Sequence, residues 1–252
     1  MSNKEKLLKA FRIAANVVTD SGVLFQAANT IFNWTTSGIP GVVFNLAALT
    51  ICAGLRLAFE LKKDVPQPLE ENLFHKAVQN PNTSLLVVSA AQFIAMIAAV
   101  PDAHLGNWES IKGAAMPMCF AVGCAVAPLN QENIRSKLAK TILTKEVYFA
   151  AGMIMAGASW APAVVFGAAG ALAVYRNLSG KKAGPDPLYL LSGGNSLAVI
   201  ANAGNIGPMV ALGSNCVAYL SIKAGIECGG ISEAVQAGWA RIRGSSRNPQ
   251  PC

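Results

Sequence analysis

Most charged residues of this chain stand in short links between long apolar stretches. Each stretch has the length of a helix, and a helix satisfies its own backbone hydrogen bonds in lipid. The pattern therefore predicts an all-α membrane protein that folds as a polytopic helical bundle. The expected helices cover residues 10–32, 39–61, 83–100, 111–129, 146–158, 162–176, 187–203 and 206–224.

The composition argues against an ordinary soluble domain. Of the 252 residues, 53% are hydrophobic and only 13% are charged, and the mean hydropathy is +0.41. Soluble domains carry roughly 25% charged residues. About half that charge cannot cover a globule of this size, so we expect lipid to contact much of its surface. The 23 glycines fit this class, because small residues let membrane helices approach one another closely.

Links that carry Lys and Arg alternate with links that carry few or none. Under the positive-inside rule this alternation predicts eight transmembrane helices with both termini in the cytoplasm. Six or seven spans are the alternative, because the helices over 146–158, 162–176 and 187–203 are short for a bilayer. The chain is compact and no segment resembles a cleaved signal peptide, so we expect a bacterial inner membrane. Three tryptophans fall in the cation-poor links, as an interfacial aromatic belt predicts: Trp34, Trp108 and Trp160.

A short string occurs twice, as Pro40-Gly-Val-Val-Phe44 and as Pro162-Ala-Val-Val-Phe166. Two weaker matches follow in the same order along the chain. Together they predict a duplicated four-helix unit whose halves are parallel repeats about an axis along the membrane normal. Chance similarity between Ala- and Val-rich segments is the alternative. The predicted division is a first half over 1–130, a second half over 131–226 and a polar tail over 227–252. The weaker matches begin at Ser84 with Ser196 and at Pro117 with Pro208.

The polar segments predict little chemistry. The net charge is +7, but the cations cluster between apolar stretches, so we do not expect nucleic acid as a partner. The six cysteines form no C-x-x-C motif, and His75 and His104 have no metal-ligand spacing. The chain shows no P-loop and no Ser-His-Asp order. We therefore expect neither an enzyme with catalytic residues nor a cofactor or metal site. Two short surface helices are predicted, over 69–78 and over 231–242.

Asp20 is the carboxylate that stands well inside a predicted span. At 100° per residue it shares one face of the 10–32 helix with Asn16 and Gln26. A carboxylate in a bilayer normally faces a cavity or a partner and is often functional. The functional interpretation is coupling or gating by a proton or cation. The structural alternatives are an ion pair within the bundle, for example with Arg56, or a position near the interface.

A second group of candidates is a stripe of amides near the end of the 187–203 helix. Asn195, Asn202 and Asn205 lie on one side of it, and Asn215 adds an amide on the next helix. Such groups can bind a polar solute, or they can join helices by hydrogen bonds. The Gly204–Pro208 turn could also be a helix break that presents free backbone groups to a ligand.

The architecture predicts a transporter or channel for a small solute or ion, with the pathway between the two halves. In this hypothesis Asp20, Asn16, Gln26, Asn195, Asn202 and Asn205 line the pathway. The alternative is a non-catalytic membrane subunit or scaffold of a larger complex. The expected partners are the lipid bilayer and either other membrane proteins or further copies of this chain.

Overall fold

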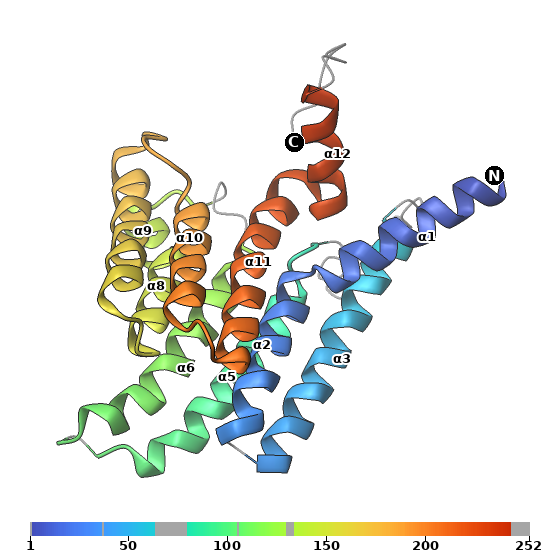
Figure 1. Ribbon diagram of the computed structural model, residues 1–252. Coiled ribbons are helices and arrows are strands. Elements are labelled where there is room, and N and C mark those ends of the chain that lie inside the picture. Colours follow the sequence, from blue (N-terminus) through green and yellow to red (C-terminus); the bar gives the residue numbers. More distant parts are fainter. Residues whose placement is uncertain (1, 37, 64–79, 105, 130–133, 243–252) are drawn as a thin grey trace.

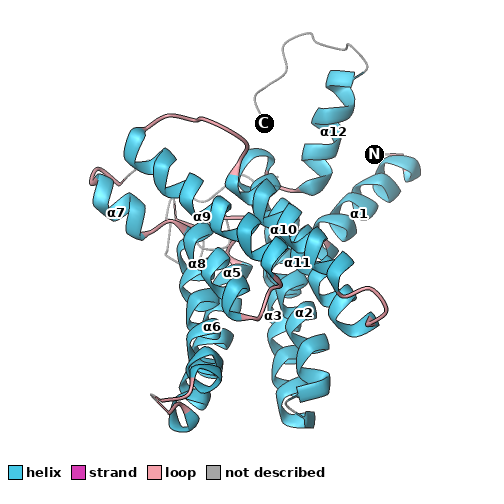
Figure 2. Cartoon of the chain, turned by 60° about the vertical axis from the view of Figure 1, so that its left-hand side comes forward, coloured by secondary structure: helices cyan, strands magenta, loops and turns pink. Residues whose placement is uncertain are grey.

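The computed structural model describes residues 2–36, 38–63, 80–104, 106–129 and 134–242, and in these residues the fold is all-helical (Figures 1 and 2). The predicted surface helix over 69–78 and the last ten residues of the tail lie outside the described part. The α-helices are α1 (Asn3–Val18), α2 (Ser21–Thr36), α3 (Gly38–Lys62), α5 (Ser84–Ala99), α6 (Trp108–Val126), α7 (Lys137–Ile142), α8 (Lys145–Met155), α9 (Trp160–Ser179), α10 (Pro187–Ala201), α11 (Ile206–Cys228) and α12 (Ile231–Ile242), and the 3-10 helix η1 covers Val100–Asp102.

The helix ends follow ordinary capping chemistry. Asp186 precedes α10 and its Oδ1 accepts a hydrogen bond from the Leu188 backbone nitrogen at 2.9 Å, while Pro187 occupies the first turn. Asn107 caps α6 in the same way. At the other end, Gly180 terminates α9 with φ of 68°, a left-handed conformation that glycine adopts without strain.

In the part of the chain that the structure describes, eight helices form a closed ring. Helices α2, α3, α5, α6, α8, α9 and α10 each pack against the next, and α11 returns to pack against α2. Two further contacts cross the ring, between α2 and α5 and between α8 and α10. Outside it, α1 contacts α3 and α12 and projects away from the bundle (Figure 1).

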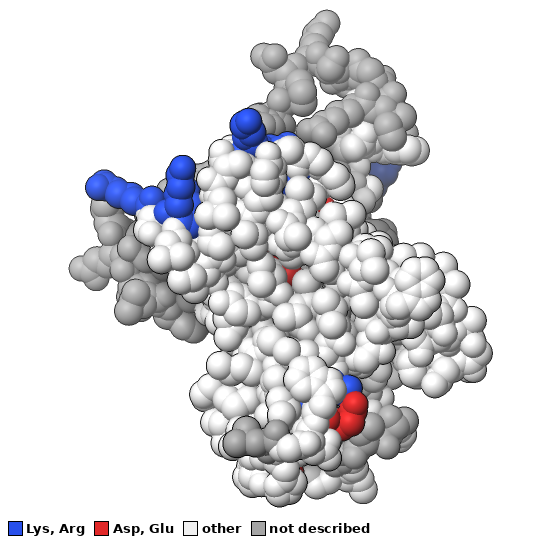
Figure 3. Space-filling view, turned by 90° about the vertical axis from the view of Figure 1, so that its left-hand side faces the viewer, with Lys and Arg blue, Asp and Glu red and all other residues white. Residues whose placement is uncertain are grey.

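Among the described residues, four helices are long and apolar enough to cross a membrane. They are α3, α5 together with η1, α9 and α11. In addition, α10 is apolar but shorter. Association with a membrane therefore follows from the length and composition of these helices. Figure 3 shows one face of the bundle whose middle is nearly free of charged side chains, with Lys and Arg gathered toward its upper end.

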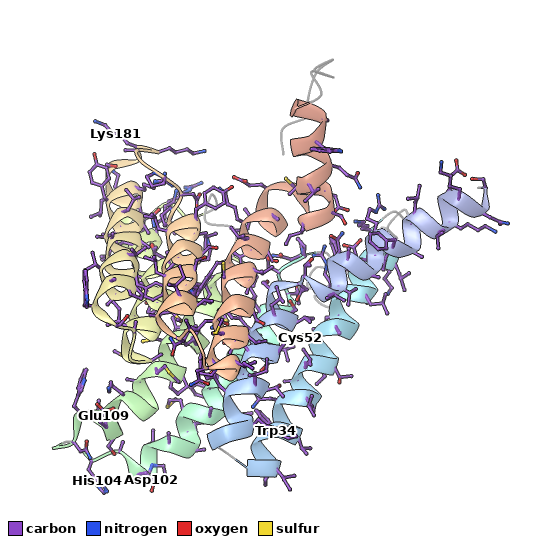
Figure 4. The ribbon with its side chains drawn as sticks, in the orientation of Figure 1. Trp34, Cys52, Asp102, His104, Glu109 and Lys181 are labelled. Carbon is purple, nitrogen blue, oxygen red and sulfur yellow. The ribbon has the colours of Figure 1, made fainter. Side chains whose placement is uncertain are left out.

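The two ends of the bundle differ in charge as the links predict. Figure 4 places Lys181 at one end and Trp34, Asp102, His104 and Glu109 at the other. The link that contains Lys181 follows α9, and α9 is 20 residues long, about 30 Å at 1.5 Å per residue. We call these the cation-rich end and the cation-poor end.

The first predicted helix is interrupted. The sequence predicts one helix over 10–32, whereas the structure has α1 and α2 with a break at Thr19 and Asp20. The break has a physical cause: Asp20 caps α2, and the Thr19 Oγ1 donates a 2.7 Å hydrogen bond to the Ala15 carbonyl. Side chains that bond the local backbone in this way compete with continuous helix.

The matched strings do not occupy matched positions. Leu85 is fully buried, whereas its sequence match Leu197 is 40% exposed. In α3, Asn45, Ala48 and Cys52 are buried, and in α9 Phe166, Ala169 and Ala173 are buried at the same spacing. The Pro-Val-Val-Phe match aligns Phe166 with Phe44, so the two buried series are one residue out of register with it. The match between α6 and α11 agrees in burial over part of its length, although Val126 is buried and its match Val217 is exposed. It pairs Ala121 with Leu212, Cys124 with Asn215 and Ala127 with Ala218.

Close helix contact at Gly194 generates a stability prediction. A Cβ at this position would lie 2.5 Å from Cε1 of the buried Phe166, whereas a Cβ at Gly193 would meet nothing within 4 Å. We expect Gly194→Ala to destabilise the protein by about 1–3 kcal/mol through overpacking. Gly193→Ala is the matched control on the same helix and should leave stability unchanged or slightly higher. Thermal unfolding of both variants in one detergent measures this, and equal midpoints would contradict the α9–α10 packing.

Candidate functional site

A cavity of about 360 Å³ lies within the ring. This volume is at the lower end of the range of small-molecule pockets, roughly 300–1,000 Å³. Its walls come from both predicted halves: α2, α5 and α6 on one side, and α8, α10, α11 and the α8–α9 link on the other. Ala156, Gly157 and Ser159 of that link are exposed as well as lining the cavity, so the mouth lies at the cation-poor end.

The polar groups of this cavity are neutral. They are four amides, Asn29, Gln92, Asn202 and Asn215, and the Ser159 hydroxyl, and none of the lining residues in the described chain is charged. The remaining wall is apolar and includes aromatic rings and methionines. We call this space the amide cavity. Amides both donate and accept hydrogen bonds, so the cavity suits a small uncharged molecule with polar groups.

Two of the amides are held by their own helix. The Asn202 Nδ2 donates to the Ala198 carbonyl at 2.8 Å, at the end of α10. The Asn29 Nδ2 donates to the Oε1 of Gln26 at 3.3 Å, one turn earlier on α2. These bonds fix the two side chains and leave the amide oxygens of Asn202 and Asn29 as acceptors for a ligand.

An aromatic layer lies against the amide cavity. It consists of Phe25 from α2, Phe120 from α6, Phe149 from α8 and Tyr219 from α11. Phe25 and Phe120 line the cavity, while Phe149 and Tyr219 are fully buried behind them. The ring centroids are 5.3–6.4 Å apart, within the range of favourable aromatic pairs. The layer therefore closes the cavity on its inner side with helices from both halves.

Several buried side-chain polar atoms have no hydrogen-bond partner among the described residues. Three of them are the Gln26 Nε2, the Asn195 Oδ1 and the Tyr219 hydroxyl. The second polar atom of each amide is engaged: the Asn195 Nδ2 donates to the Leu191 carbonyl at 3.0 Å. Leaving a buried polar atom unpaired costs about 1–3 kcal/mol, and none of these three residues is among those that line the amide cavity.

The predicted site residues are divided by the structure. Asn202 lines the amide cavity, and Gln26 supports it through Asn29. Asn195 is fully buried but does not line the cavity, and Asn205 is exposed at the start of α11. Asn16 and Asp20 lie elsewhere, beside a hollow of about 10 Å³ that can hold no more than a single water.

Asp20 is held as a helix cap. Its Oδ1 accepts hydrogen bonds from the backbone nitrogens of Gly22 at 2.9 Å and Val23 at 3.2 Å, the second and third positions of α2. The Ser84 hydroxyl at the start of α5 donates to the same oxygen at 2.5 Å. This geometry satisfies a buried carboxylate without a ligand and joins α2 to α5.

Asn16 belongs to a second polar region, which we call the charged cluster. The Arg56 Nη2 lies 2.6 Å from the Glu60 Oε1, and both residues are buried. Lys63 contacts Glu60 at 2.7 Å and Glu233 of α12 at 2.8 Å. Burial alone would raise the pKa of Glu233, but hydrogen bonds from Lys63 and Asn16 hold the pKa below its ordinary value. The charged cluster comprises Asn16, Arg56, Glu60, Lys63 and Glu233.

Sequence reasoning missed two amides of the cavity, Asn29 and Gln92, and noted a third, Asn215, only as an additional amide beside the predicted stripe. Each is an amide in an otherwise apolar helix, and this is the sequence feature by which it could have been found. What the sequence lacks is the rotation of each helix in the ring, which decides whether an amide faces the cavity or a neighbouring helix. No group of three or more His, Cys, Asp or Glu side chains suited to a metal occurs in the described residues.

Comparison of the chain with protein-family models, with curated proteins and with solved structures found no match.

The cap geometry predicts which of two Asp20 variants is the less stable. Asp20→Ala removes the acceptor of three hydrogen bonds and should destabilise the protein by about 1–2 kcal/mol. Asp20→Asn keeps an acceptor oxygen and is expected to cost less, since Asn is also a good cap. Denaturation of both in the same detergent compares them. If Asn and Ala lowered stability equally, the capping role would be wrong.

Proposed function

We propose that the chain is a membrane transporter or channel for a small uncharged solute. The observation that carries this proposal is the amide cavity, which lies between helices of both halves and has hydrogen-bonding groups without a charged residue in its described wall. A site for a free ion requires charged or multiple oxygen ligands at close range. Four amides in an apolar wall instead favour a neutral molecule that exchanges its water for amide contacts.

The same proposal includes eight spans. The eight helices of the ring alternate in direction between the cation-rich and cation-poor ends, with both termini on the cytoplasmic side. Four of them have 16 residues or fewer: α2 and α5 have 16 each, although η1 extends α5, while α8 has 11 and α10 has 15. Short spans are accommodated by flanking residues, by tilt or by a thinned bilayer. The positive-inside rule then places the mouth of the amide cavity outside the cell.

Duplication of a four-helix unit is also part of the proposal. Its support is the order of helix contacts, because α2–α3–α5–α6 and α8–α9–α10–α11 pack in the same sequence. The contact of α6 with α8 corresponds to that of α11 with α2, and the crossing contact of α2 with α5 corresponds to that of α8 with α10. Parallel repeats with a site at their interface are a known plan of membrane transporters.

A topology experiment tests the membrane assignment. Trp160→Cys and Lys181→Cys are placed singly in a chain whose native cysteines are replaced, and intact cells are treated with a membrane-impermeant maleimide. We expect residue 160 to react from outside and residue 181 only after permeabilisation, because α9 separates them. Labelling of both from the same side would contradict the proposed spans.

A permeation experiment tests the cavity. Proteoliposomes are challenged with urea or glycerol, and solute entry is followed by light scattering. We expect Gln92→Leu and Asn215→Leu each to slow entry about three- to tenfold, the value of one lost hydrogen bond to a neutral group. Asn205→Leu is the matched control, since this amide is exposed outside the cavity. Entry no faster than in protein-free vesicles for either probe would contradict the proposed function.

Two further measurements belong to this experiment. Uptake by wild type and Asp20→Asn across a pH series tests the coupling role expected for Asp20, and equal, pH-insensitive uptake would remove that role.

Native mass measurement after mild solubilisation tests the alternative of a non-catalytic subunit. A monomer or small homo-oligomer supports the independent transporter, and a stable hetero-complex without permeation supports the subunit.

A further inference from the structure

The apolar side of α1 faces away from the protein. Leu7, Phe11 and Val18 recur at helical spacing and are 71%, 75% and 65% exposed, and Leu8 lies beside them. A surface helix of a soluble protein turns this side toward the core. Helix α1 has the reverse orientation, and it projects from the ring so that no other described helix covers this face (Figure 1).

The orientation of α1 is fixed by its polar side. Asn16 lies roughly opposite the apolar face and is buried in the charged cluster. Its Nδ2 donates to Glu60 of α3 at 3.1 Å and to Glu233 of α12 at 2.9 Å, and its Oδ1 accepts from the Ser232 backbone nitrogen at 3.0 Å. The Thr19 carbonyl also accepts a hydrogen bond from the Ser221 hydroxyl of α11. Rotation of α1 to bury its apolar side would break these bonds.

The start of α1 is strongly basic. Its sequence has four cations, Lys4, Lys6, Lys9 and Arg12, and one carboxylate, Glu5; Arg12 lies 3.9 Å from Glu233 of α12. Glu5 is part of the capping box with Ser2, in which the Ser2 nitrogen donates to the Glu5 Oε2 at 2.6 Å. Lys4 and Lys6 are exposed. The helix therefore combines a fixed apolar face with a cationic first turn.

We infer that α1 is an interfacial helix that binds anionic phospholipid at the cation-rich end of the bundle. A bilayer is the apolar phase next to the helices that are long enough to span it. The apolar face enters the boundary between headgroups and acyl chains, and Lys4 and Lys6 contact lipid phosphates. This inference goes beyond the proposed transport and does not depend on it.

The experiment places a nitroxide label at residue 11 of the full chain. Phe11→Cys is made in a chain whose native cysteines are replaced, and the protein is reconstituted into nanodiscs of zwitterionic phospholipid or of the same lipid with added phosphatidylglycerol. Collisions of the label with oxygen, which concentrates in lipid, are compared with collisions with a water-soluble nickel chelate. We expect oxygen to dominate, and the preference to rise with the anionic fraction.

Second-site variants separate the contribution of the lysines from that of the apolar face. Lys4→Gln and Lys6→Gln should each shift the label population toward water about fivefold in anionic nanodiscs, the effect of one cation near a charged surface. Leu7→Gln should shift it in both lipids, because it weakens burial of the apolar face. Val235→Gln is the matched control, an equally exposed valine on α12 that should have no effect. Unchanged helical content by circular dichroism shows that each variant is folded.

Three results would overturn the inference. If the nickel chelate collided freely with the label in both lipids, the apolar face would be in water. Shielding from oxygen and nickel alike would mean that protein covers it, such as a second copy of the chain. If the label were buried in lipid to the same extent at every anionic fraction and in both lysine variants, anionic phospholipid would have no role in binding α1.

Discussion

The buried guanidinium of Arg56 is the group on which the arrangement of the peripheral helices depends. It lies 2.6 Å from Glu60 and also donates hydrogen bonds to the carbonyls of Pro81 at 3.1 Å and Gly229 at 2.7 Å. A buried charge is tolerated only when such partners are in place, and loss of one typically costs about 3–5 kcal/mol. The end of α3, the segment before α5 and the turn from α11 to α12 therefore have to converge on this residue. Through Glu60 and Asn16 the same requirement extends to α1.

The polar groups of the interior are separated by charge. The charged cluster joins α1, α3 and α12, whereas the amide cavity opens toward the cation-poor end and is neutral in its described wall. The aromatic layer closes the inner side of the cavity. Ionic interactions are far stronger in the low dielectric of a protein interior than in water. Keeping the ions away from the cavity leaves hydrogen bonding and shape to govern what it accepts.

The sequence predicts helices well because apolar length and polar links are local properties. Helices α9 and α11, for example, begin and end within four residues of the expected 162–176 and 206–224. The break before α2 was not predicted, because periodicity alone favoured one helix through Asp20, whose side chain caps the next one instead. Of the residues predicted to line a pathway, Asn202 lines the amide cavity. Asn29, Gln92 and Asn215 face the cavity because of how their helices are rotated in the ring, and no local pattern records that rotation.

The contact between α11 and α2 has a consequence for biosynthesis. The first helix of the ring is made early, but the neighbour that completes its packing emerges last. Until then the side of α2 that α11 will cover is without its final partner. The ring therefore has to wait for α11 before it can close. A nascent chain arrested before α11 would present an open polar seam, the kind of feature by which membrane proteases and chaperones distinguish incomplete products from finished ones.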